Sequence, residues 1–240
     1  MASHELEITS AGAIEHLLVH RPAQIRKLIV GGRGPRRENI LELARRAGVA
    51  VEEKNQEGLR ALLNPYPYAD LDRWLSELPA KALVVVLDHL EDPQNFGAIC
   101  RTAEALGVNG AIIPKDRSVE VTAGVYHASV GGVANLPIVK VTNLSATIKR
   151  LRDEGFWIVG TALGEKSTAP AQVPDFDRVA LVLGSEYSGM SEKLVDKCDW
   201  QVNVPLVGTV PSLNVSAAAA ILLFEFSKRL SVPPSAPPQQ

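Results

Sequence analysis

The sequence predicts an α/β fold, a parallel sheet with helices on both faces, preceded by a small α/β region. Three observations predict it. From Lys81 onward, short apolar segments of strand length alternate with segments of helical periodicity. The apolar segments are nearly uninterrupted, which is typical of strands buried on both faces of a parallel sheet. Hydrophobic residues make up 46% of the 240 residues, enough for one large domain or for a medium domain with a small one.

Residues 1–64 are predicted to form the small α/β region. The apolar spacing of AGAIEHLLVH predicts a helix over residues 11–20, and IRKLIV predicts a strand over residues 25–30. ENILELARRAG predicts a helix over residues 38–48 that ends at a glycine. VAVEE, directly after it, predicts a strand over residues 49–53.

Two prolines in NPYPYADL predict a linker over residues 65–80, which includes a short helix in DLDRWLSEL. The main region spans residues 81–230, and the proline-rich residues 231–240 are predicted to be disordered. The predicted strands of the main region cover residues 82–88, 110–114, 136–141, 156–162, 178–184 and 200–205. The predicted helices cover residues 97–107, 145–155, 191–197 and 216–230.

Composition argues against several classes of protein. Cys100 and Cys198 are the only cysteines and the five histidines are scattered, so we expect no metal site. No apolar run approaches the roughly 18 residues that a membrane helix needs. The N-terminus lacks the basic and then apolar pattern of a secretion signal. No dinucleotide-binding or P-loop motif follows a strand. We therefore expect a metal-free cytoplasmic protein.

Charge is distributed unevenly along the chain. Residues 1–64 carry ten Lys and Arg against eight Asp and Glu, a balance of +2, which leaves −4 for the remainder of the total of −2. The loop GGRGPRR gathers Arg33, Arg36 and Arg37 on a glycine-rich backbone. Such a loop is either an ordinary solvated surface or a patch that contacts the phosphates of a nucleic acid.

Ligands of open α/β sheets bind at the carboxyl ends of the strands, so the loops that leave those ends are the candidates for ligand contacts. Asn95 and Arg101 follow the first strand of the main region, and each reads either as a cap or solvated residue or as a ligand contact. Glu186 lies in a turn between two glycines. Ser212 and Asn214 stand before the last helix, where they either cap it or face a ligand at its positive end.

Three segments in this order resemble the motifs of the SpoU-type RNA ribose 2′-O-methyltransferases. They are DPQNFGAICRTA at residues 92–103, LVLGSEYSGM at residues 181–190 and VPLVGTVPSLNVSAAA at residues 204–219. The resemblance covers residues 82–230. PKDRS at residues 114–118 and VTNL at residues 141–144 further resemble the branch that methylates a guanosine in 23S ribosomal RNA.

The resemblance implies an S-adenosylmethionine-dependent enzyme with a C-terminal trefoil knot, acting as a homodimer on RNA. The small N-terminal region resembles the ribosomal-protein-like RNA-binding domain that precedes the catalytic domain in this branch. Carried over by motif, the cofactor-binding positions are Leu183, Gly184, Val204, Pro205, Leu206 and Leu213. The catalytic positions are Asn95, Arg101, Glu186, Ser212 and Asn214, and the RNA-binding positions are Arg33, Arg36, Arg37 and Arg101.

The implied reaction moves a methyl group from a sulfonium to a ribose hydroxyl, which is a weak nucleophile until its proton is drawn away. A guanidinium stays protonated, so we expect Arg101 to hold a flanking phosphate and to polarise the 2′-oxygen. Ser212 and Asn214 would align that oxygen. The alternatives are a transfer RNA 2′-O-methyltransferase, an antibiotic-resistance enzyme of the same family, and a non-catalytic RNA-binding protein on the same scaffold.

Overall fold

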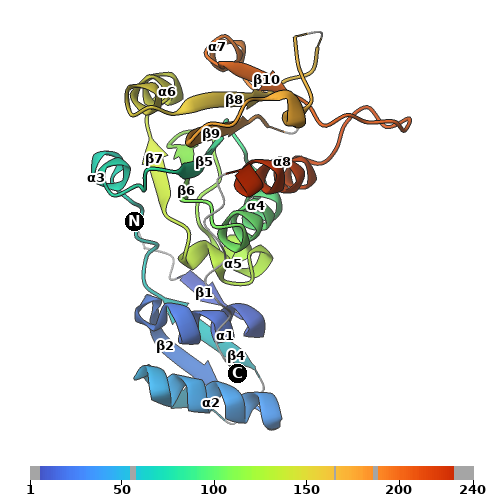
Figure 1. Ribbon diagram of the computed structural model, residues 1–240. Helices are drawn as coiled ribbons and strands as arrows, with labels where there is room; N and C mark the ends of the chain where they lie inside the picture. Colours follow the sequence, from blue (N-terminus) through green and yellow to red (C-terminus); the bar gives the residue numbers. More distant parts are fainter. Residues whose placement is uncertain (1–5, 55–57, 165, 186–188, 230–240) are drawn as a thin grey trace. The chain divides into compact units, whose positions relative to one another are not determined.

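A computed structural model describes residues 6–54, 58–164, 166–185 and 189–229 of the chain (Figure 1). Its chain divides into two compact units. The first combines Met1–Tyr68, Asp92–Ala105 and Val119–Pro137, and the second combines Ala69–Glu91, Leu106–Ser118 and Ile138–Gln240. No helix of the described residues is long and apolar enough to cross a bilayer.

The first unit contains a four-stranded sheet in the order β1-β4-β2-β3. Its strands are β1 (Leu6–Ile8), β2 (Ile25–Val30), β3 (Val51–Glu53) and β4 (Leu59–Leu63). Its helices are α1 (Ala11–His20), α2 (Pro35–Ala47), α4 (Pro93–Ala105) and α5 (Ala123–Ala128), with short 3-10 turns η1 (Pro22–Gln24) and η2 (Gly132–Ala134). Only the β2–β3 pair is parallel among the pairings of this sheet that the described residues form.

The second unit contains a six-stranded sheet in the order β10-β8-β9-β5-β6-β7, and all its pairings are parallel. Its strands are β5 (Ala82–Leu87), β6 (Gly110–Pro114), β7 (Ile138–Val141), β8 (Trp157–Thr161), β9 (Arg178–Leu183) and β10 (Trp200–Val202). Its helices are α3 (Leu71–Ser76), α6 (Leu144–Asp153), α7 (Glu192–Val195) and α8 (Val215–Arg229), with the 3-10 turn η3 (Pro170–Gln172).

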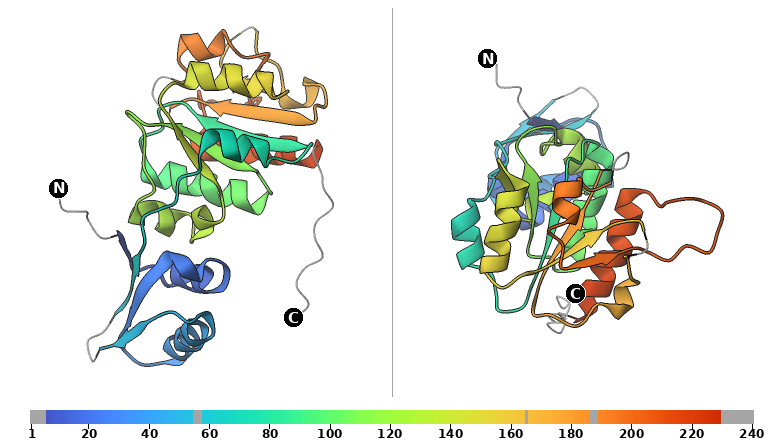
Figure 2. Two further views of the ribbon diagram at one scale, coloured as in Figure 1. Left: turned by 90° about the vertical axis from the view of Figure 1, so that its left-hand side faces the viewer. Right: turned by 90° about the horizontal axis from the view of Figure 1, so that it is seen from above.

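Helices cover both faces of this sheet, as Figures 1 and 2 show, which confirms the predicted α/β fold with a parallel sheet. One face carries α3, α6 and α7, whose buried residues form a single core with alternate residues of the strands. That core includes Trp74, Ile148 and Leu194 from the helices and Val84 and Val86 from β5. On the other face, α8 packs against β9 and buries its own apolar residues, Ala219, Leu222, Leu223 and Phe226.

Several element boundaries differ from the sequence prediction. Helices α2 and α4 begin at Pro35 and Pro93, earlier than predicted, because proline has the right φ for a first helical turn and loses no needed N–H there. Strands β7 and β10 are shorter than predicted. Strands β1 and β4 and helix α5 had no counterpart in the prediction. The predicted disordered tail, residues 231–240, lies outside the described residues.

Candidate active site

The carboxyl ends of β8, β9 and β10 lie at one edge of the parallel sheet, where ligands of such sheets bind. Because β9 and β10 both pair with β8, the loops that leave them begin close to one another. The positions expected to bind the cofactor lie at these strand ends and in the loop after β10: Leu183, Gly184, Val204, Pro205, Leu206 and Leu213. The sheet therefore brings the starts of two of the three motif segments to the same edge.

Backbone hydrogen bonds join the two described ends of the loop after β9. Ser185 and Gly189 exchange N–H···O hydrogen bonds of 3.1 and 3.0 Å. A Cβ atom on Gly184 would lie 2.0 Å from the carbonyl carbon of Gly189, so no side chain fits there without moving the backbone. Leu183 is buried, and its carbonyl accepts the backbone N–H of Asp88. Glu186, predicted to be catalytic, lies outside the described residues.

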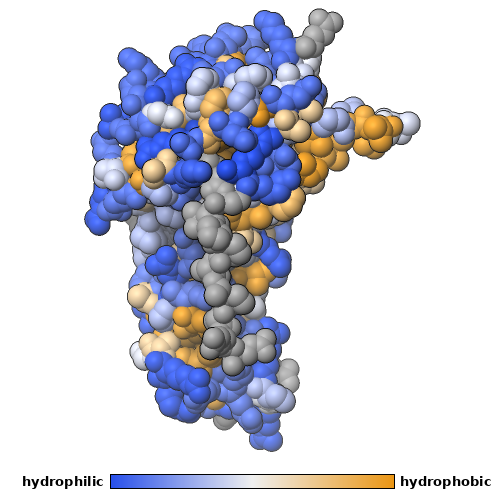
Figure 3. Space-filling view, viewed as in Figure 1, coloured by the Kyte–Doolittle hydropathy of each residue, from blue (hydrophilic) through white to orange (hydrophobic). Residues whose placement is uncertain are grey.

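The loop after β10 is exposed and apolar. Val207 is 105% exposed and Val210 is 59% exposed, and Figure 3 shows apolar side chains gathered on this projecting segment. In the described part of the chain, the backbone groups of residues 204–213 make no hydrogen bond with another backbone group. Because unpaired peptide groups need partners when they are covered, this loop offers donors and acceptors to a ligand or to a second chain.

Asn214 caps helix α8. Its Oδ1 accepts hydrogen bonds from the backbone N–H of Ser216 at 2.8 Å and from the Ser216 hydroxyl at 2.6 Å. The capping role that the sequence left open is therefore present in the structure. Ser212, two residues earlier, is exposed at the same end of the helix, where the helix dipole favours negative charge.

Asn95 and Arg101 lie on α4 in the first unit. Asp92, not Asn95, caps this helix: its carboxylate accepts the N–H groups of Gln94 at 3.0 Å and Asn95 at 3.3 Å. One face of this helix is buried, with Phe96, Ile99 and Ala103 all at 0% exposure. Arg101 is exposed on the opposite side, and no hydrogen bond or ion pair joins its side chain to another residue of the described chain.

A polar network holds α4 against α1 one turn beyond Arg101. Asn135 is its centre: Oδ1 accepts from Arg21 Nε at 2.9 Å, and Nδ2 donates to Glu104 Oε1 at 3.2 Å. The same Nδ2 lies 3.0 Å from His16 Nε2. Because the arginine can only donate, it fixes which end of the amide faces it, and His16 Nε2 must then be the unprotonated acceptor.

The His16 contact predicts a pH dependence of stability. Burial and the neighbouring His20 lower the pKa of His16 below its ordinary value of 6.5. The unfolded chain therefore binds more protons than the folded protein below about pH 6.5, and the free energy of unfolding falls as pH is lowered from there toward the folded pKa. His16→Gln should flatten this slope, measured by urea unfolding between pH 7.5 and 5. The exposed His127→Gln should leave it unchanged, and an unaltered slope in His16→Gln would contradict the assignment.

The N-terminal arginines are partly engaged with acidic residues. Arg36 donates to both carboxylate oxygens of Glu15 at 3.1 Å, and Arg37 is ion-paired with Glu53. Both arginines lie in the first turns of α2, because that helix begins at Pro35 and not after the loop. Arg33 remains in the loop and is exposed. Exposed ion pairs are worth little, so phosphates can compete for these side chains.

Asp88, a buried carboxylate directly after β5, is not among the residues predicted to be functional. Its exposure is 3%, and its Oδ2 accepts the backbone N–H of Ser191 at 2.7 Å while Oδ1 lies 2.6 Å from His89 Nδ1. Its own N–H donates to the carbonyl of Leu183 at 2.8 Å. Asp88 therefore ties both ends of the β9 loop to the end of β5.

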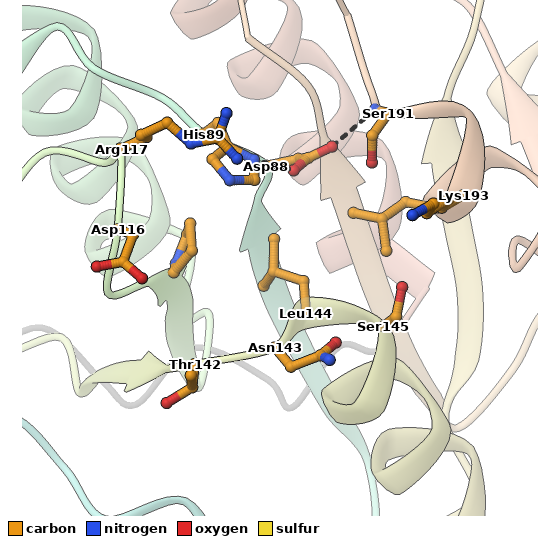
Figure 4. A pocket seen from close by; sticks show the side chains of 12 residues that line it. Asp88, His89, Asp116, Arg117, Thr142, Asn143, Leu144, Ser145, Ser191 and Lys193 are labelled. Atoms are coloured by element: carbon orange, nitrogen blue, oxygen red, sulfur yellow. Dashed lines mark hydrogen bonds and ion pairs between the residues drawn. The ribbon is translucent and has the colours of Figure 1, made fainter.

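Asp88 also lines a depression of about 230 Å³ at the carboxyl ends of β5, β6 and β7 (Figure 4). The PKDRS and VTNL segments, separate in sequence, both contribute to it. The one signal in the sequence that could have pointed here is a charged residue directly after six apolar ones at the ligand edge of the sheet.

The two cysteines are unsuited to nucleophilic chemistry. Burial raises the pKa of the Cys100 thiol strongly and raises the pKa of Cys198 to about 12. Neither forms a thiolate at neutral pH. Among the residues that the structure describes, no group of three or more His, Cys, Asp or Glu side chains is placed to hold a metal ion.

Comparison with known proteins agrees with these motifs. The model of the SpoU rRNA Methylase family matches residues 82–224. A Staphylococcus aureus protein assigned to the TrmH family of tRNA/rRNA methyltransferases is 46% identical over 180 residues, which cover 73% of this chain and 72% of that protein.

Solved structures share the fold. The SpoU methyltransferase AviRb from Streptomyces viridochromogenes, in complex with the cofactor AdoMet, matches with a TM-score of 0.78 at 24% identity, covering 94% of this chain and 90% of that one. An RNA 2′-O ribose methyltransferase matches with a TM-score of 0.75 at 23% identity, covering 93% and 88%.

Proposed function

Because the chain belongs to the SpoU rRNA Methylase family, we propose that it transfers a methyl group from S-adenosylmethionine to a ribose 2′-hydroxyl of structured RNA. The observation that carries the proposal is that the family match contains all three motif segments, in order, with the residue types that the reaction needs. The solved relatives with AdoMet or with 2′-O-ribose activity support the same chemistry.

The cofactor is assigned to the loops after β9 and β10. Two features fit it: Gly184 lets the backbone of Gly189 and Met190 approach the end of β9 closely, and the β10 loop carries backbone groups with no backbone partner in the described chain. The positions are those carried over from the motifs: Leu183, Gly184, Val204, Pro205, Leu206 and Leu213. When bound, S-adenosylmethionine supplies an electrophilic methyl group on a positively charged sulfur.

The residues of the chain then have to position and activate the sugar. Arg101 is an exposed guanidinium that stays protonated, so it holds the phosphate beside the target ribose and polarises the 2′-oxygen. Ser212 and Asn214 align that oxygen from the start of α8, with Asn95 and Glu186 completing the catalytic set. Holding the oxygen in line with the methyl group at about 3 Å supplies much of the rate.

A homodimer is part of the proposal. The β10 loop and α8 expose apolar side chains that a single chain leaves in water, among them Val207, Val210, Ile221 and Phe224. Exposed apolar patches of this kind mark protein contacts. Sedimentation should give a species of twice 25.8 kDa; a single 25.8 kDa species at micromolar concentration would count against the dimer. A trefoil knot in the C-terminal part belongs to the same proposal.

The substrate proposed is 23S ribosomal RNA at a guanosine, with residues 1–64 acting as the RNA-binding domain through Arg33, Arg36 and Arg37. The PKDRS and VTNL segments favour this substrate over transfer RNA. The test is transfer of labelled methyl groups from S-adenosylmethionine to ribosomal and transfer RNA prepared from a strain that lacks the gene. Label on the ribose of ribosomal RNA supports the proposal. Label on transfer RNA would replace ribosomal RNA by transfer RNA as the substrate, and label on neither refutes the proposal.

A further inference from the structure

We propose that the depression between the PKDRS and VTNL segments binds a nucleotide of the RNA strand that flanks the methylated one. This inference rests on the proposed function and extends it to a second RNA contact. The depression is open to solvent and polar, and Figure 4 shows Arg117 and Lys193 on opposite sides of it with Leu144 between them. Leu144 is 7% exposed and belongs to the core beneath, so it forms a firm floor.

The depression adjoins the proposed cofactor loop through shared residues. Asp88 and Ser191 line it, and the 2.7 Å hydrogen bond between them closes the β9 loop that begins at Gly184. β5 pairs with β9 in register up to Leu87 and Leu183, so the two loops leave neighbouring strands at the same edge. An RNA strand with one ribose at the cofactor therefore has its neighbouring nucleotides within reach of the depression.

The charges of the depression suit a nucleotide better than a bare anion. Arg117 and Lys193 are exposed and form no ion pair with any other described residue, so both are available to phosphate oxygens. The negative charge of Asp116 would repel a simple anion. Its carboxylate can, however, accept hydrogen bonds from a ribose hydroxyl or a base amine. The Thr142 hydroxyl adds a second such group, exposed on the same wall.

The backbone of the depression is held in an unfavourable conformation at two places. The backbone φ angles of His89 and Arg117 are 56° and 49°, values that residues other than glycine adopt only at a cost in conformational energy. Both residues line the depression, and the only other such residue in the described chain, Val130, is in the other unit. Strain of this kind concentrates at functional sites, because the conformation that function needs is retained despite its cost.

The test measures RNA binding and cofactor binding separately in the full-length protein. Filter binding of ribosomal RNA from a strain lacking the gene should give a dissociation constant about tenfold higher for Arg117→Ala with Lys193→Ala, at about 0.1 M salt. The slope of log K against log salt should fall by about 0.7–0.9 for each phosphate contact removed. Arg117→Lys, which keeps the charge and loses the planar fork, should recover part of the affinity.

Lys149→Ala is the control for loss of a surface charge, since it removes one exposed positive charge from α6 outside the depression. It should bind RNA as the wild type does, and titration calorimetry should give all variants the same affinity for S-adenosylmethionine. Equal RNA affinities in the double variant and the control would overturn the inference while leaving the proposed function intact. A wild-type protein that binds RNA but transfers no methyl group would refute the proposed function alone.

Discussion

Arg101→Lys is expected to lower the turnover number for methyl transfer about 100-fold while RNA affinity changes less than threefold. Lysine keeps the positive charge but lacks the planar fork that can hold a phosphate and polarise the neighbouring oxygen together. Removing one preorganised donor from a developing negative charge typically costs ~100-fold or more. The exposed position of Arg101, opposite the buried face of α4, means that the substitution leaves the helix packing unchanged.

The measurement is single-turnover methyl transfer at saturating RNA, with RNA affinity determined in parallel. Arg73→Lys on α3 is the control, because this exposed arginine has only Glu77 as its ion-pair partner in the described chain. Near-wild-type turnover in Arg101→Lys with RNA affinity intact would show that the planar guanidinium of Arg101 is not needed for methyl transfer. A loss confined to RNA affinity would reduce Arg101 to a binding residue.

Gly184→Ala is expected to abolish most cofactor binding and to destabilise the second unit. The added Cβ would lie 2.0 Å from the Gly189 carbonyl carbon and 2.1 Å from the Met190 nitrogen, both of them backbone atoms. The backbone at Gly184, Gly189 and Met190 must then shift, which costs about 1–3 kcal/mol as overpacking does elsewhere. Affinity for S-adenosylmethionine should fall more than tenfold by calorimetry, with a lower melting temperature.

Gly124→Ala is the matched control for this substitution. A Cβ on Gly124 meets nothing closer than 3.6 Å, an ordinary contact, and lies on α5 in the first unit. It should bind the cofactor normally. Unchanged cofactor affinity in Gly184→Ala would mean that the β9 loop does not seat the cofactor.

The sequence predicts the elements best where local and tertiary preferences agree. Residues 11–20, 25–30 and 110–114 have the predicted bounds in α1, β2 and β6. Two features of the sequence predict helix α1. Ser10 accepts the Ala13 N–H as an N-terminal cap, and the apolar stripe of the helix is buried. β1, by contrast, has only three residues, and a single one is buried, so its strand state comes from pairing with the distant β4.

The sequence likewise predicts only the part of the candidate site whose residues are adjacent along the chain. Motif order identifies the loops after β5, β9 and β10, because those residues are adjacent in sequence. It could not find the Asp88–Ser191 contact, whose partners are 103 residues apart, or the Asn135 network, which joins residues from three distant segments. Nor could it show that Asp92 rather than Asn95 caps α4, since both residue types are good caps.

The most direct test of methyl transfer to a ribose is a map of 2′-O-methylation in ribosomal and transfer RNA from cells with and without this gene. We expect one ribose methylation to disappear from 23S ribosomal RNA when the gene is deleted. We also expect this methylation to return with the wild-type gene but not with Arg101→Lys. Identical maps in both RNA populations with and without the gene would contradict the assignment of this protein as a ribose methyltransferase.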